Sequence, residues 1–176
     1  MRERLLPLRS HDRDVLLCAA AVGSRFDLDL LVELHRSTPA RVRAALRAGS
    51  NLQLIEPIPG ETGRYQFRHA LMRDAIYAEL VAARLQPLHR EIGAALERLA
   101  ARRPANLDDL AYHWWAAGDA ARGARYNEAA GDRAAALHAP EEARTSYRRA
   151  LDLLPRSSSA LRARLEAKAA ALDDPR

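Results

Sequence analysis

The feature that most constrains the fold is a change of hydrophobic period within residues 64–80, RYQFRHALMRDAIYAEL. In its first five residues polar and apolar side chains alternate, which places Tyr65 and Phe67 on one side of a strand. After His69 the apolar residues recur at helical spacing, and they are Leu71, Met72, Ala75, Ile76 and Leu80. A strand must therefore give way to a helix at this histidine.

Two short amphipathic helices are predicted at the start of the chain. The first follows a cap at Asp12 or Asp14 and stops at Gly23. The second opens at Asp27. Its expected buried stripe consists of leucines, namely Leu28, Leu30, Leu31 and Leu34.

A third helix opens with Ser37 or Thr38 as its cap and Pro39 in its first turn, and it stops at Gly49. The period then changes, because NLQLIE puts Leu52 and Leu54 on one face and the following PIPGETG can only form a turn. With RYQFR as the second arm, this gives a β-hairpin. Three short helices followed by a two-stranded wing form the winged-helix pattern.

The rest of the chain is predicted to be helical. One helix covers residues 70–83, and another begins near Pro87 and is broken at Pro104. Helical hairpins follow, with helices at 107–117, 119–137, 140–154 and a last one ending at Leu172.

A repeat signature lies in this second half. Ala143, Tyr147, Ala150 and Pro155 have the spacing of the second helix of a tetratricopeptide repeat (TPR), with Gly131 at the small position of the first helix. Small residues let the paired helices approach, and the tyrosine fills the gap between repeats. The expected fold is therefore mainly α, a winged helix with one small β-hairpin followed by TPR-like helical hairpins. Its expected parts are an incoming linker, the winged helix, a connecting helix and a partial repeat array, at residues 1–10, 11–84, 85–103 and 104–176.

Composition supports helix and argues against several functions. Alanine, leucine and arginine dominate, which favours helix. The net charge is +5, but Lys168 is the only lysine and both signs are interspersed, so we give the basic balance little weight as a sign of a nucleic-acid partner. The longest apolar run, residues 15–22, is too short to span a membrane. Cys18 stands alone, so neither a disulfide nor a thiolate metal site is expected. With no signal peptide at the N-terminus, we expect a cytoplasmic protein without a membrane partner.

No catalytic motif is present in the sequence. The segment at residues 118–125, GDAARGAR, has two glycines at phosphate-loop spacing but lacks the Lys-Ser/Thr that would hold phosphate and Mg²⁺. It is interpreted as a turn between helices. Zinc-ligand spacings and a nucleophile elbow are also missing. We therefore expect no enzyme, no catalytic residue, no metal and no cofactor bound by this chain itself.

Two groups of residues are candidates for partner contacts. Arg41, Arg43 and Arg47 lie away from the apolar face of the third helix, either as a solvated face or as contacts to DNA. The aromatic residues of the YHWW segment, Tyr112, Trp114 and Trp115, are either anchors for a partner or hydrophobic filling between the two halves.

Several segments together resemble a known family. They include FRHAL at residues 67–71, the following DAIY, LH at residues 88–89, and the YHWW and EEARTSYRRALDLL segments. The chain from about residue 15 to residue 154 is similar to the region that follows the ATPase module in bacterial signal-transduction (STAND) ATPases, as in the large ATP-binding LuxR-type transcriptional regulators and the cyclase-linked ATPases.

The resemblance implies a role for His69. In that superfamily the winged helix folds back on the nucleotide-binding module, and a histidine at this position contacts the phosphates of ADP, like the Met-His-Asp histidine of plant resistance proteins. Phe67 and Ala70 stand where that motif has other residues, so the role is carried by position. An imidazole near a helix N-terminus and beside Arg68 is well placed to meet a phosphate. His89 is expected to pack the helix that begins near Pro87, with no chemistry assigned to it.

The resemblance also implies partners outside this chain. No Walker A lysine precedes the winged helix and no DNA-binding helix-turn-helix follows the repeats. The chain is thus expected to be the middle of a larger switch, with ATP or ADP held by an upstream nucleotide-binding module in cis or in trans. The repeats would bind a protein or small-molecule effector, and DNA would be met through a further domain. The alternative is a freestanding winged-helix DNA-binding protein with a helical dimerisation tail.

Overall fold

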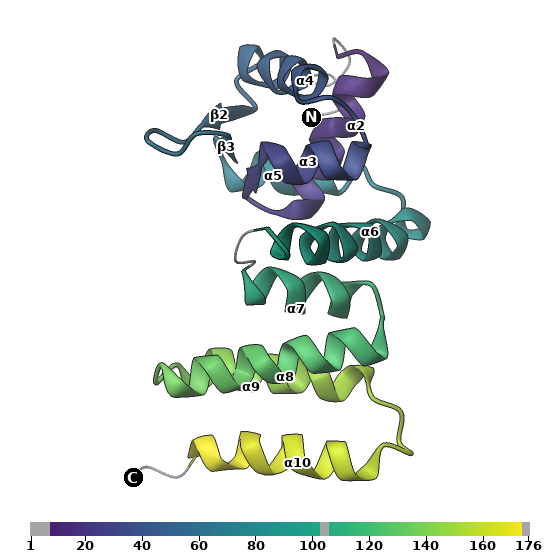
Figure 1. The fold of residues 1–176 in the computed structure, drawn as a ribbon, viewed down its shortest axis with the longest axis vertical. Helices are drawn as coiled ribbons and strands as arrows, with labels where there is room; N and C mark the ends of the chain where they lie inside the picture. Colours follow the sequence, from purple (N-terminus) through teal and green to yellow (C-terminus); the bar gives the residue numbers. More distant parts are fainter. Residues whose placement is uncertain (1–7, 103–105, 174–176) are drawn as a thin grey trace. The chain divides into compact units, whose positions relative to one another are not determined.

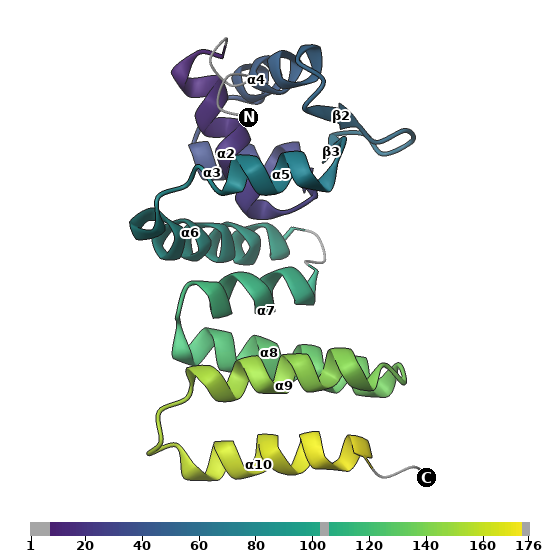
Figure 2. The same cartoon turned by 180° about the vertical axis from the view of Figure 1, so that it is seen from behind.

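The computed structural model of the chain describes residues 8–102 and 106–173. The described residues are mainly helical and include one small antiparallel sheet, so the predicted fold class is confirmed (Figures 1 and 2). The chain divides into two compact units, Met1–Ala95 and Leu96–Arg176. The division falls inside helix α6 (Ala82–Ala100). Within the described part of the chain, no helix has the length and apolar character needed to cross a membrane.

The first unit contains three helices and a sheet, followed by α5 and the start of α6. Its elements are α2 (Ser10–Val22), β1 (Arg25–Asp27), α3 (Leu28–His35), α4 (Pro39–Asn51), β2 (Ile55–Pro57), β3 (Arg64–Phe67) and α5 (Ala70–Tyr77). Its core is apolar and gathers the inner faces of α2, α3 and α4 over the sheet. The largest members are Leu16, Phe26, Leu31, Leu46, Leu54, Ile55, Phe67 and Ile76.

The sheet has three strands, in the order β1-β3-β2. The predicted hairpin is confirmed, because β2 and β3 pair antiparallel with Ile55 opposite Phe67. The strand β1 was not expected. It also pairs antiparallel with β3, and the ring of Phe26 lies 5.5 Å from that of Phe67. Three residues, RFD, are too few to show an alternating pattern, so only the tertiary pairing makes them a strand.

Two boundaries expected for the first three helices of this unit are wrong. Helix α2 begins at Ser10, ahead of Asp12 and Asp14, and no side chain caps it. It does end before Gly23, as predicted. The Thr38 cap of α4 is confirmed, since its hydroxyl oxygen accepts a hydrogen bond from a backbone N–H in the first turn.

The predicted stop at Gly49 is the second error, because α4 continues to Asn51 and Gly49 is buried inside it. A Cβ on Gly49 would lie 3.0 Å from Leu16 Cδ2 and 3.3 Å from Ile55 Cδ1. This glycine serves close packing and does not end the helix. Consequently Leu52 lies at the C-terminus of α4 and not in a strand.

The helix expected over residues 70–83 is divided. Helix α5 ends at Tyr77, where the N–H groups of Ala78 and Leu80 bond back to Asp74 and Tyr77 in a closing turn. Helix α6 then begins five residues before Pro87, which therefore lies inside it. The apolar spacing continues through both helices, so the sequence period does not reveal the turn between them. The break predicted at Pro104 lies outside the described residues.

The second unit holds the helical hairpins that the sequence predicted. After the end of α6 its helices are α7 (Leu107–Ala116), α8 (Ala120–Ala136), α9 (Pro140–Leu153) and α10 (Ser159–Ala170), followed by the short 3-10 helix η1 (Ala171–Asp173). The glycine-containing segment GDAARGAR is a helix-connecting turn, as expected. Gly118 has φ 66°, and the Asp119 carboxylate caps α8 by accepting from the N–H of Arg122 at 2.9 Å.

The helices α8 and α9 pack through the glycine and tyrosine that the repeat pattern singled out. A Cβ on Gly131 would lie 2.4 Å from Cε1 of Tyr147, so the ring occupies the space that any larger side chain would need. Ala143 and Ala150 are fully buried beside it, and the Tyr147 hydroxyl donates to the Asp132 carboxylate at 2.8 Å. The close approach of the paired helices at small residues is therefore as predicted, while the contact shown for Tyr147 lies within this pair of helices.

We expect Gly131→Ala to destabilise the second unit by up to about 2 kcal/mol, because overpacking against a buried ring costs about 1–3 kcal/mol and alanine gains only roughly 1 kcal/mol over glycine in a helix. Urea unfolding followed by tryptophan fluorescence measures this, since both tryptophans lie in α7. In a Tyr147→Leu background the same substitution should be neutral or stabilising. An equal loss of stability in both backgrounds would contradict the packing role.

Candidate functional site

His69 lies at the junction where β3 passes into α5. The strand before it is anchored on both sides, since the N–H of Phe67 bonds to the Ser24 carbonyl at 3.0 Å and that of Arg68 to the Leu54 carbonyl at 3.1 Å. His69 is the N-cap residue of α5, with extended φ −139° and ψ 137°. Its imidazole is exposed and makes no capping hydrogen bond. The side chain is therefore presented to solvent by a fixed backbone.

The N-terminus of α5 offers backbone donors beside this imidazole. Only the N–H groups of Met72 and Arg73 bond back to the His69 carbonyl. The first N–H groups of a helix have no intrahelical acceptor, and here those belong to the exposed residues Ala70 and Leu71. They carry the positive end of the helix dipole, which favours anions. An imidazole and a helix N-terminus thus face solvent together.

Arg68 was expected to join His69 at a phosphate, but its guanidinium is engaged elsewhere. Its Nε lies 3.1 Å from a carboxylate oxygen of Glu56 on the neighbouring strand β2. This pair is solvent-exposed, with Arg68 at 43% and Glu56 at 37%. It is therefore weak and exchangeable. Of the two predicted residues, His69 is free to meet a ligand and Arg68 must first leave an ion pair.

Leu71 is a feature of this junction that the period did not predict. The helical spacing places it on the apolar face, yet its side chain is 80% exposed, while Ile76 on the same helix is fully buried. Met72 and Tyr77 of this short helix pack against the core, whereas the Leu71 side chain stays outside it. An exposed leucine two residues from His69 adds an apolar contact to the junction.

Polar contacts of Arg73 and Tyr77 hold α5 against α2 and α6. The Arg73 Nε donates to the Ala20 carbonyl of α2 at 2.8 Å, and its guanidinium lies 4.9 Å from the centre of the Tyr77 ring. The Tyr77 hydroxyl lies 3.0 Å from Nε2 of His89 on α6. Burial, and then the nearby Arg73 charge, lower the pKa of His89, which is 2% exposed. His89 packs its helix, as expected, and also links α5 to α6 by a hydrogen bond.

The three arginines of α4 are exposed, as predicted. Among the residues that the structure describes, no carboxylate forms an ion pair with Arg41, Arg43 or Arg47. Val42 and Leu46 between them are fully buried, so the guanidinium groups point away from the core. This arrangement fits a solvated face and a phosphate-binding face equally.

The aromatic trio of α7 is separated by the fold. Trp114 is 2% exposed, and the guanidinium of Arg122 lies 4.7 Å from the centre of its ring, so this residue packs inside the second unit. Tyr112 and Trp115 are half-buried, with ring centres 6.1 Å apart. The guanidinium of Arg149 lies 4.9 Å from the Trp115 ring and 5.5 Å from the Tyr112 ring. Only these two rings are placed to contact a partner.

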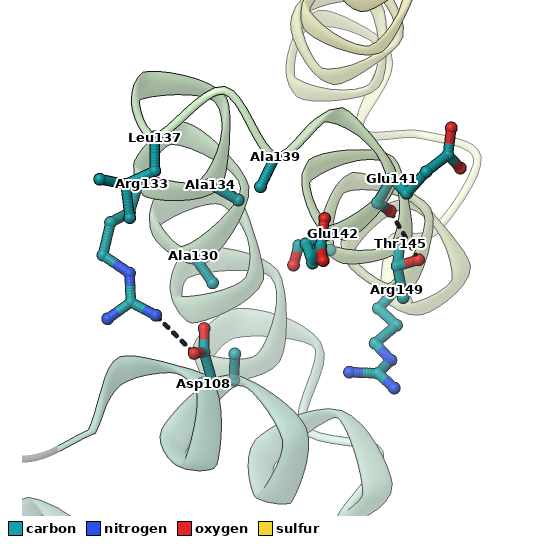
Figure 3. Close-up of a pocket in the computed structure, with 12 residues that line it drawn as sticks. Asp108, Ala130, Arg133, Ala134, Leu137, Ala139, Glu141, Glu142, Thr145 and Arg149 are labelled. Atoms are coloured by element: carbon teal, nitrogen blue, oxygen red, sulfur yellow. Dashed lines mark hydrogen bonds and ion pairs between the residues drawn. The ribbon is translucent and has the colours of Figure 1, made fainter.

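A cleft of about 550 Å³ lies in the second unit, between α7, α8 and α9 (Figure 3). Small apolar residues of α8 and of the turn after it form part of the lining, and Figure 3 shows Ala130, Ala134 and Ala139 between two charged walls. On one wall Arg133 pairs with Asp108 at 2.5 Å. On the other, Glu142 and Arg149 of α9 line the cleft.

A smaller cavity of about 300 Å³ lies in the first unit, where Cys18 and His35 are among its lining residues. Burial raises the pKa of the Cys18 thiol to about 11, so it stays protonated and unreactive at neutral pH. Burial also lowers the pKa of His35. Across the described ranges, no three histidine, cysteine, aspartate or glutamate side chains are grouped as a metal site requires.

Comparison of the chain with protein-family models, with curated proteins and with solved structures found no match. Three features of the structure bear on its function: the junction at His69, the arginines of α4 and the cleft of the second unit.

Proposed function

We propose that the chain is a non-catalytic regulatory module of a multidomain signalling ATPase. Its first unit meets the nucleotide-binding module, in cis or in trans, and its helical hairpins bind an effector. The observation that carries the proposal is the exposed His69 imidazole beside the uncapped N-terminus of α5.

The chemistry of that junction suits a nucleotide phosphate. A neutral or charged imidazole N–H donates to a phosphate oxygen, and the helix N-terminus adds backbone donors and a partial positive charge. Hydrogen bonds to a charged phosphate are stronger than those between neutral groups. Because β3 is held on both edges by β1 and β2, the donors keep their relative positions without the ligand.

Neighbouring residues supply the rest of a contact surface. Leu71 offers apolar area to the facing module, and a phosphate or carboxylate there can draw Arg68 away from Glu56. The contact is thus an exchange of ion pairs at little net cost. The ADP-bound state would hold the two modules together, and its loss would release them.

When the chain is combined with its nucleotide-binding module, we expect His69→Ala to speed ADP release by about 10–100-fold, as the loss of a hydrogen bond to a charged group of roughly 1.5–3 kcal/mol implies. Release of a fluorescent ADP analogue measures this. His138→Ala is the matched control, since His138 is also exposed but lies in the second unit. Unchanged ADP retention in the His69 variant would contradict the proposal.

A freestanding DNA-binding protein is the second candidate, favoured by the three exposed arginines on α4 that no described carboxylate neutralises. A helix that packs by one face and carries guanidinium groups on its exposed surface is suited to the major groove and its phosphates. In this function the second unit serves as a dimerisation tail.

If the chain binds DNA, its affinity for duplex falls steeply with salt. Replacing Arg41, Arg43 and Arg47 by glutamine then lowers the slope of log K against log salt by about one for each phosphate that the variant no longer neutralises. Gel-shift titrations at two or more salt concentrations measure the slope. Arg148→Gln is the control, because Arg148 is equally exposed but lies on α9. If the chain is instead a regulatory module, neither the unaltered chain nor any of these variants binds duplex DNA measurably.

A further inference from the structure

Two charged side chains in the cleft of the second unit form no ion pair with any other described residue. Glu142 and Arg149 both line the cleft from α9. Within the described part of the chain, no cation pairs with Glu142 and no carboxylate pairs with Arg149, whose guanidinium rests on the Trp115 and Tyr112 rings. The other charged walls are self-neutralised, since Arg133 pairs with Asp108 and Arg144 pairs with Glu141. The cleft therefore presents one free negative and one free positive group.

The space between these two charges is apolar and open. It is bordered by small side chains, and they are Ala111, Ala130, Ala134 and Ala139. Leu137 completes the rim and is 71% exposed, although it is a large apolar residue. A volume of about 550 Å³ is within the range of small-molecule sites. An occupant with apolar side chains would cover Leu137 and rest on the alanines.

The spacing of the charges sets the length of the occupant. Glu142 and Arg149 are seven residues apart on one helix, which is two turns and roughly 10 Å along the axis. An extended peptide of three residues spans about the same distance, at some 3.3–3.6 Å per residue. Its two ends carry an ammonium and a carboxylate group at neutral pH.

We propose that this cleft binds a short apolar peptide of about three residues as its free zwitterion, with the amino end at Glu142 and the carboxylate at Arg149. The inference rests on the proposed function in one respect, that the helical hairpins hold an effector, and it names the chemical class of that effector. Charge complementarity selects this occupant. A simple anion would be repelled by Glu142, and a polyamine would be repelled by Arg149.

The carboxylate of the peptide would bind to the guanidinium of Arg149. The guanidinium of Arg149 already rests against two aromatic rings, so less side-chain freedom is lost when it binds a carboxylate. Binding there changes the surroundings of the Trp115 indole directly. Trp114, the other tryptophan, is buried beneath Arg122 and serves as a constant background.

The test uses the full chain and free tri-alanine as the probe, followed by tryptophan fluorescence and by titration calorimetry. We expect saturable binding of tri-alanine, weakened about tenfold when the amino end is acetylated or the carboxyl end is amidated, since each change removes one charge pair. Lack of saturable binding, or equal binding of free and blocked peptides, would overturn the proposal. A polyamine that binds more tightly than tri-alanine would overturn it as well.

Charge-removing variants assign each end. Glu142→Gln should weaken binding of free tri-alanine about tenfold but leave binding of the acetylated peptide unchanged. Arg149→Gln should likewise weaken binding of free tri-alanine about tenfold but leave binding of the amidated peptide unchanged. Arg148→Gln is the matched control, because Arg148 is exposed at the preceding position of α9 but does not line the cleft. Circular dichroism checks that each variant keeps its helices. An equal effect of the control variant would refute the assignment.

These results are independent of the nucleotide. Peptide binding is measured without any ATPase module, so its failure leaves the outcome of the His69→Ala experiment untouched. Conversely, unchanged ADP retention in the His69 variant together with peptide binding would leave a peptide receptor whose output lies elsewhere.

Discussion

The position of the junction at His69 depends on β3, the central strand of the sheet. It pairs with β1 on one edge and β2 on the other, and its last residues remain anchored by backbone hydrogen bonds. Phe67 faces the core from this strand, while the next residues turn outward into α5. A buried aromatic side chain and two rows of ladder bonds thus fix where His69 stands. Without the second edge the strand would be one arm of an isolated hairpin, which is marginally stable at best.

The fold followed from the sequence wherever a periodic pattern was long enough. The helices of the second unit, the hairpin and the close approach of paired helices at Gly131 were predicted because apolar spacing and small residues signal them directly. Errors arose where tertiary contacts override local rules. The strand β1 exists only through its pairing with β3. Gly49 lies inside a helix that continues past it, and its lack of a side chain makes room for Leu16.

The candidate site was predictable in its identity and only partly in its chemistry. A titratable residue at a change of period pointed to His69, and its exposure and free imidazole agree with an outward-facing role. The pairing of Arg68 with Glu56 and the exposure of Leu71 were hidden, since each depends on which strand or core lies nearby. The free charges of Glu142 and Arg149 were hidden for the same reason. Helical spacing shows that they share a face, but only the packed helices show that neither forms an ion pair among the described residues.

The central claim is that His69 faces outward to meet a neighbour's bound nucleotide. Modification of exposed histidines by diethyl pyrocarbonate, located by mass spectrometry, tests it most directly, with the exposed His138 as the internal reference and the buried His113 as the unreactive one. The account predicts that His69 reacts in the chain alone and is protected when the ADP-loaded nucleotide-binding module is added, while the reactivity of His138 does not change. Equal modification of His69 with and without that loaded module would contradict the account.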